Sequence, residues 1–165
     1  NIFLNLIAAS VIALYEETLS QVIALAIFMP ILSDMSGCSG SQAVAVSIRE
    51  LSLGLVQPRD FLRVWWKESQ VGLFNGLILG ILLAVLAFVW KGSFALAVVV
   101  GLALGINTFV GGCAGGLLPL MIRRLGIDPA LAAAPILTTI TDMFGFFLAL
   151  SFTALALKSG FLVPF

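Results

Sequence analysis

Three long apolar stretches, at residues 69–90, 93–121 and 130–157, constrain the fold of this chain more than any other feature. Each exceeds the roughly 20 apolar residues with which a helix crosses the hydrocarbon core of a bilayer. Charged residues make up 10% of the 165-residue chain, whereas soluble domains carry about 25%. We therefore predict an all-α integral membrane protein.

Two further segments complete a predicted set of five transmembrane helices. Residues 2–14 are apolar but would extend only about 20 Å as a helix, so we interpret them as the remainder of a first span that begins before Asn1. Residues 18–53 are predicted to form the second span. Pro30 and the small residues at 33–42 favour a kink or a broken turn at its middle. Such broken helices expose carbonyl groups to ions in transporters.

The segment at residues 58–68 lies just before the third span. It combines paired tryptophans with alternating charges, which is typical of an amphipathic helix in the membrane interface. We therefore expect an interfacial helix at about 58–68 that leads into the third span.

Small and amide side chains within the spans indicate close helix packing. Glycine recurs at every fourth position of the third span, at Gly72, Gly76 and Gly80. Such a ridge lets a neighbouring helix approach closely. Among the amides inside spans, we interpret three as interhelical hydrogen bonds rather than ion ligands: Gln42, Asn75 and Asn107.

A weak internal similarity relates the second and fourth spans at a constant offset of 75 residues. The matching positions are Gly37 and Gly112, Cys38 and Cys113, Gly40 and Gly115, and Arg49 and Arg124. Both spans run in the same direction, so the similarity is compatible with a parallel repeat. Four identities in glycine-rich sequence also arise by chance.

Basic residues gather on one side of the predicted membrane segments. Six fall on one side, namely Arg49, Arg59, Arg63, Lys67, Arg123 and Arg124, and Lys91 and Lys158 fall on the other. The positive-inside rule then places the N-terminus in the cytoplasm, and we expect a bacterial inner (plasma) membrane. Glu16 and Glu17 lie at the outer mouth in this orientation. The formal net charge is zero, which removes nucleic acid as an expected partner.

An acid near the middle of the fifth span, Asp142, is the first functional candidate. A charge at that depth costs roughly 2.5 to 17 kcal/mol, so it usually faces a partner or a water-filled path. Thr138 and Thr141 place further oxygens close to it, with Thr138 on the same helical face. Asp34 lies at a similar depth in the second span. With no basic residue at that depth, both carboxylates need protons or a cation.

Two other classes of function, a protease and a structural subunit, are alternatives to a cation path. An intramembrane aspartyl protease would use Asp34 and Asp142 as a dyad that shares a proton and activates water. A structural membrane subunit would need only the glycine ridges. The chain has no histidine and two cysteines, which excludes the usual zinc and haem arrangements and a disulfide framework. We expect a divalent-cation channel or transporter and not an enzyme.

Three motifs are specific in their spacing and order. They are Phe28-Met29-Pro30 leading into Gly37-x-x-Gly40-x-Gln42 and Arg49, the run LPLMIRRLGIDPA at residues 118–130, and the run PILTTITDMFG at residues 135–145. On these motifs the chain resembles the transmembrane domain of the MgtE family of magnesium channels, over essentially all of its length. We therefore expect residues 1–165 to form a single MgtE-like transmembrane domain in a lipid bilayer.

The resemblance implies a homodimer of five-helix protomers, with an ion path between the protomers lined by the second and fifth helices. The family's pore aspartate falls on Asp142, and the position one helical turn earlier is Thr138. The family's acid at the outer end of the second helix falls on Glu16, with Glu17 beside it. Family members commonly carry cytosolic regulatory domains before the membrane part, and nothing in these residues matches them.

Two departures from the family pattern concern the ion. The family usually has Gly-Gly-Asn-x-Gly in the second helix, where this chain has Ser36-Gly37-Cys38-Ser39-Gly40, and Asp34 stands where glycine is common. We expect Mg²⁺, held by Asp142 with Thr138, Thr141 and the carbonyl groups of Gly37 and Cys38. The thiol makes Mn²⁺ or Co²⁺ the alternative ions.

Overall fold

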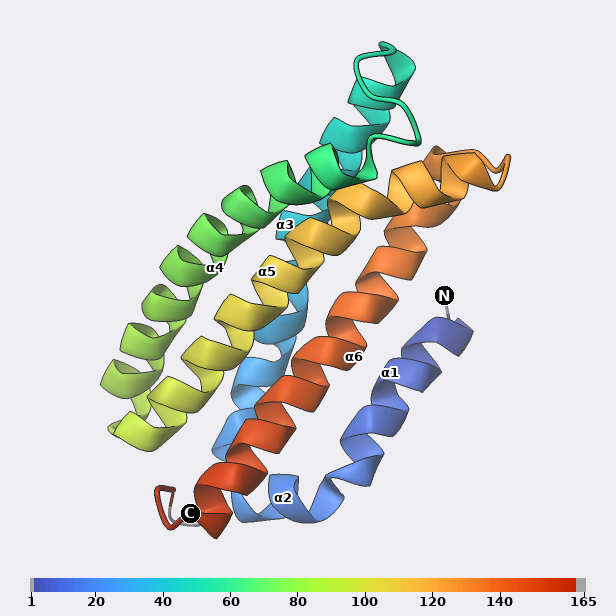
Figure 1. Ribbon diagram of the computed structural model, residues 1–165. Coiled ribbons are helices and arrows are strands. Elements are labelled where there is room, and N and C mark those ends of the chain that lie inside the picture. Colours follow the sequence, from blue (N-terminus) through green and yellow to red (C-terminus); the bar gives the residue numbers. More distant parts are fainter. Residues whose placement is uncertain (1, 163–165) are drawn as a thin grey trace.

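The computed structural model describes residues 2–162, which form six α-helices and no strand (Figure 1). The helices are α1 (Ile2–Leu14), α2 (Glu16–Gln21), α3 (Ala24–Ser52), α4 (Phe61–Lys91), α5 (Phe94–Arg124) and α6 (Pro129–Lys158). The predicted all-α class is confirmed. The predicted single domain also includes Asn1 and residues 163–165, which lie outside the described residues.

Helix α5 lies at the centre of the bundle. It packs against α4 on one side and against α3 and α6 on the other, and α3 also packs against α6. Helix α1 lies along α6, and the short α2 closes the end of the bundle at which the C-terminus lies (Figure 1). The two helices proposed from sequence to line a path are therefore neighbours within one chain.

Three helices in the described part of the chain are long and apolar enough to cross a membrane: α4, α5 and α6. Helix α1 is apolar but shorter. Helix α3 has 29 residues and contains several polar side chains, and it is not among the three. The integral membrane character predicted from composition agrees with this pattern, whereas the number of five spans stays a prediction.

The broken turn expected as one alternative at the middle of the second span is absent from the described residues, and a kink there stays a prediction. Helix α3 continues through Pro30 and through residues 33–42, and the helix is interrupted instead at Val22 and Ile23, between α2 and α3. Pro30 lies early in α3, where its missing N–H removes a single hydrogen bond from an otherwise continuous ladder. The small residues that follow are used for close packing, and their backbone stays helical.

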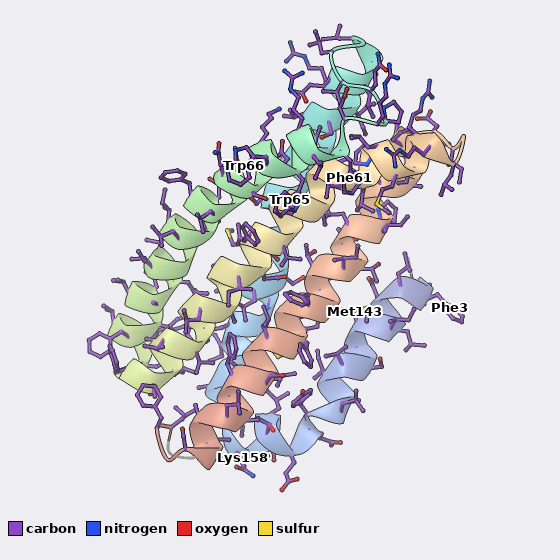
Figure 2. The ribbon with its side chains drawn as sticks, viewed as in Figure 1. Phe3, Phe61, Trp65, Trp66, Met143 and Lys158 are labelled. Atoms are coloured by element: carbon purple, nitrogen blue, oxygen red, sulfur yellow. The ribbon has the colours of Figure 1, made fainter. Side chains whose placement is uncertain are left out.

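The predicted interfacial segment, from Phe61 on, and the third span belong to one helix, and the interfacial position of residues 58–68 stays a prediction. Helix α4 runs from Phe61 to Lys91 without interruption, and Trp65 and Trp66 are exposed in its first turns (Figure 2). Glu68 points the other way, because its side chain is buried against Gly116 of α5. Protein packing on this side keeps the segment in line with the rest of α4.

The predicted glycine ridge packs α4 directly onto α5. A Cβ atom added to Gly76 would collide with the carbonyl oxygen of Gly105, and one added to Gly80 would lie 2.7 Å from the carbonyl oxygen of Gly101. The two backbones therefore touch without side chains between them, and the packing prediction for this ridge is confirmed.

Helices α3 and α5 run in parallel, and they pack in the register of the internal similarity. A Cβ atom on Gly115 would collide with the carbonyl oxygen of Gly40, and one on Gly111 would lie 2.9 Å from that of Ser36. Each contact joins positions 75 residues apart. One matched pair, Gly40 and Gly115, thus lies in contact between the two helices, and the parallel repeat itself stays a hypothesis.

Candidate functional site

Asp142 lies near the middle of α6 and is half-buried (its neighbour Met143 marks this depth in Figure 2). Its Oδ1 accepts a hydrogen bond of 2.5 Å from the hydroxyl of Ser33 on α3. The ion pairs found within residues 2–162 both involve Lys67, so Asp142 has no cationic partner there. The partner that orients the Asp142 carboxyl group is therefore a neutral hydroxyl.

Thr138 lies one turn before Asp142, and its side chain is exposed. Its hydroxyl donates to the carbonyl oxygen of Pro135 at 3.0 Å, a bond within α6. The lone pairs of its oxygen stay available on the outside of the bundle. Thr138 and Asp142 thus both present oxygen atoms along α6, in the order predicted from the sequence.

Thr141 and Gly37 occupy a different place from Asp142. Both are buried, and the Thr141 hydroxyl donates to the carbonyl oxygens of Leu137 and Thr138 within α6. A Cβ atom on Gly37 would lie 3.8 Å from the Thr141 hydroxyl oxygen. These two residues form the contact between α3 and α6, and they lie behind the outward surface of the two helices.

Asp34 and Cys38 lie one turn apart on the exposed side of α3. The Cys38 thiol donates to Asp34 Oδ1 at 3.9 Å, a long contact. No cluster of three or more histidine, cysteine or acidic residues suited to a metal occurs in the part of the chain that the structure describes. Asp34 and Asp142 have separate hydrogen-bond partners on this surface, Cys38 and Ser33.

Glu16 and Glu17 are exposed in the first turn of α2, at the end of the bundle near the C-terminus (Figure 1). Negative charge is favoured at a helix N-terminus, where backbone N–H groups are free. The Tyr15 hydroxyl lies 2.9 Å from the Ser151 hydroxyl and ties this end to α6. The two acids therefore form a fixed negative patch at one end of the molecule.

An asparagine behind the site joins three helices. The Asn107 side-chain amide on α5 donates to the Ser36 hydroxyl at 2.6 Å and to the Thr141 carbonyl oxygen at 2.9 Å. This confirms the interhelical hydrogen bond predicted for Asn107. Asn75 also forms one, to the Ser39 hydroxyl at 3.4 Å.

Sequence reasoning missed Ser33 as the partner of Asp142. The spacing of Ser33 and Ser36, three positions apart in an apolar helix, was an available indication of a polar face on the second span. Which helix that face meets depends on tertiary packing, which the spacing does not contain.

Comparison with known proteins agrees with this architecture. The family model for MgtE, described as a divalent cation transporter, matches residues 29–152. That range begins near the start of α3, includes α4 and α5, and ends near the end of α6.

Three relatives, each named a magnesium transporter MgtE, match most of the chain. The protein of Thermus thermophilus is 36% identical over 158 residues, which is 96% of this chain and 35% of the relative. That of Bacillus subtilis is 35% identical over 142 residues, 86% of this chain and 32% of the relative. That of Enterococcus faecalis is 32% identical over 142 residues, 86% of this chain and 31% of the relative. The chain thus spans about a third of the length of these relatives.

The family match extends over most of the described residues, and its members are transporters rather than enzymes. It includes the Asp142–Ser33 contact and both helices that carry it. The chain therefore belongs to the MgtE family of divalent cation transporters.

Proposed function

We propose that this chain forms the membrane path of a Mg²⁺ channel or transporter, with Asp142 as the central ion site. The observation that carries the proposal is the Asp142 carboxylate itself. It lies at the middle of a membrane-capable helix, it is half-buried, and it is oriented by Ser33 rather than neutralised by a base. A carboxyl group without a basic partner in this setting is well suited to bind a cation.

The path is proposed to run between two copies of the chain, along the outward surfaces of α3 and α6. Mg²⁺ usually keeps several waters and is bound through one or two carboxylates. One Asp142 from each copy, with Thr138 beside it, supplies such a set around a shared axis. Thr141 and the Gly37 backbone support this surface from behind, because both are buried in the α3–α6 contact.

The remaining acids are given roles outside the central site. Glu16 and Glu17 concentrate cations at one mouth of the path, as expected for a fixed negative patch. Asp34 and Cys38 lie on the exposed side of α3, where the acid adds an oxygen and the thiol favours softer ions such as Mn²⁺ or Co²⁺.

The proposed topology has five spans, namely a first helix that includes α1, followed by α3, α4, α5 and α6. The end that carries Arg123 and Arg124 faces the cytoplasm, and Lys158 lies at the opposite end (Figure 2). The N-terminus is then cytoplasmic, and the membrane is a bacterial inner membrane.

An aspartyl protease has no supporting observation. Its dyad requires two carboxyl groups that share a proton. In the described structure Asp142 accepts from Ser33, and Asp34 accepts from Cys38. A structural subunit remains the competing class, and it predicts that Asp142 is dispensable for ion movement.

The test is Mg²⁺ flux into proteoliposomes that contain the wild-type protein or Asp142→Asn. We expect the substitution to lower the flux by more than about tenfold, because a unit charge a few ångströms from a cation contributes energies of kcal/mol size even at an effective dielectric constant of 20. Mn²⁺, Co²⁺ and Ca²⁺ measured in parallel give the order of preference.

Asp128→Asn is the matched control for this experiment. Asp128 caps α6 through a 3.0 Å hydrogen bond from the Ala130 amide, and asparagine caps a helix equally well. This variant should conduct like wild type. Equal flux through wild type and Asp142→Asn would show that Asp142 is not the ion site.

A further inference from the structure

We propose that Asn107 is a positioning residue for the ion site. From α5 it fixes α3 and α6 in the register that delivers the Ser33 hydroxyl to the Asp142 carboxylate. The inference rests on the proposed role of Asp142 as the ion site. It assigns a function to a residue that lies behind the path and does not contact the ion.

The amide nitrogen of Asn107 reaches two helices at once. It donates to the Ser36 hydroxyl at 2.6 Å and approaches the Leu32 carbonyl oxygen at 3.4 Å, both on α3. It also donates to the Thr141 carbonyl oxygen on α6 at 2.9 Å. One side chain therefore holds the relative positions of both helices from the third.

Two of the three atoms that Asn107 contacts belong to immediate neighbours of the Ser33–Asp142 pair. Leu32 precedes Ser33 on α3, and Thr141 precedes Asp142 on α6. Leu32 and Thr141 are thus each covalently bonded to one residue of the Ser33–Asp142 pair. A shift of either helix at Asn107 is transmitted directly to the bond between Ser33 and Asp142.

The orientation of the amide follows from its partners. The carbonyl oxygens of Leu32 and Thr141 are acceptors only, so they require the nitrogen of Asn107 rather than its oxygen. The Ser36 hydroxyl is already a donor to the Leu32 carbonyl oxygen at 2.7 Å, so it accepts from Asn107. The oxygen of Asn107 is buried and accepts no hydrogen bond from any of residues 2–162. The missing hydrogen bond to this oxygen is tolerated because the nitrogen of the same side chain donates to Ser36 and Thr141.

The surrounding packing is shaped to admit this side chain. Asn107, Ser36 and Thr141 are each 0% exposed. Gly145 lies one turn after Thr141, and a Cβ atom there would collide with the Asn107 amide nitrogen. Glycine at 145 thus leaves the space through which Asn107 reaches the Thr141 carbonyl.

The test is a double-mutant cycle on the Mg²⁺ concentration that gives half-maximal flux. Asn107→Ala and Ser33→Ala should each raise this concentration about threefold to thirtyfold, as expected for losing one hydrogen bond that supports a charged group. If Asn107 acts through Ser33, the double variant should be no worse than the more severe single variant. If the fold-increases of the two single variants multiply in the double variant, the inference is overturned.

Asn75→Ala is the matched control. Asn75 is also an interhelical asparagine, but its 3.4 Å hydrogen bond joins α4 to Ser39 of α3 and does not involve α6. It should leave the half-saturating concentration unchanged. A shift equal to that of Asn107→Ala would mean that any loss of an interhelical amide has this effect, and would also overturn the inference.

Gly145→Ala provides a second variant in case Asn107→Ala does not fold. It retains the Asn107 side chain but displaces it from α6, so it should raise the half-saturating concentration. Combined with Ser33→Ala, it should raise that concentration no further than the more severe single variant does. Additive behaviour of Gly145→Ala counts against the positioning role.

The two proposals fail in distinguishable ways. Flux that is unaffected by Asp142→Asn removes the ion site, and the role of Asn107 with it. If flux depends on Asp142 but the effects of Asn107→Ala and Ser33→Ala on the half-saturating concentration multiply, only the role of Asn107 is removed.

Discussion

Asp142 differs from an acid in a membrane salt bridge in the kind of partner that it has. If Asp142 is the ion site as proposed, a lysine or arginine beside it would compete with the cation, whereas the Ser33 hydroxyl donates one hydrogen bond and carries no charge. A site that binds strongly enough to attract an ion must also release it. A single neutral donor is suited to both requirements.

Cys38 provides a prediction about ion preference. Replacing its exposed thiol by an amide, Cys38→Asn, should increase the ratio of Mg²⁺ flux to Co²⁺ flux, because a hard oxygen favours Mg²⁺ and sulfur favours softer metals. The ratio is measured by competition in proteoliposomes. Cys113→Ala removes the other thiol and should leave it unchanged; an unaltered ratio in Cys38→Asn would mean that this side chain does not face the path.

The sequence identified the charged candidates more readily than their partners. Asp142 stands out because a carboxylate in an apolar segment is costly wherever it points. Ser33 does not, because a serine in a helix can satisfy itself on its own backbone. Thr141 was expected beside the ion, but its hydroxyl turns inward, since α3 and α5 cover that side of α6.

Among the elements, the contact between α4 and α5 leaves little room for a larger side chain. Gly76→Ala places a methyl group against the carbonyl oxygen of Gly105, and backbone cannot move aside as a side chain can. We expect a loss of about 1–3 kcal/mol in the free energy of unfolding, the usual cost of overpacking. Unfolding in mixed micelles, followed by tryptophan fluorescence, measures it.

Leu77→Ala is the control for this prediction. Leu77 is the next residue and is 60% exposed on the outside of α4, so its truncation should cost much less. Equal stabilities of Gly76→Ala and wild type would contradict the close approach of the two backbones.

The helix boundaries show which local rules tertiary packing overrides. Proline and a run of small residues are fair indications of a break, yet α3 continues through both because α5 provides a glycine surface that needs those small residues. The actual interruption at Val22 and Ile23 carries neither proline nor glycine, so composition could not locate it. The glycine ridge on α4 was predictable because its four-residue period depends on helix geometry alone.

At the scale of the whole molecule, charge distinguishes the two ends of the bundle. In a background without Cys38 and Cys113, we expect Ser159→Cys to react with an impermeant maleimide added outside intact cells. Gln57→Cys, exposed at the opposite end, should react only after permeabilisation. The reverse pattern would invert the proposed orientation and exchange the mouths of the path.

The backbone contact between α4 and α5 has a mechanical consequence. Helices that slide past one another do so by small adjustments of the side chains between them. The Gly76–Gly105 and Gly80–Gly101 contacts contain no such side chains, so the hairpin has no rotamers with which to absorb shear. We therefore expect α4 and α5 to move as one unit in any change of conformation.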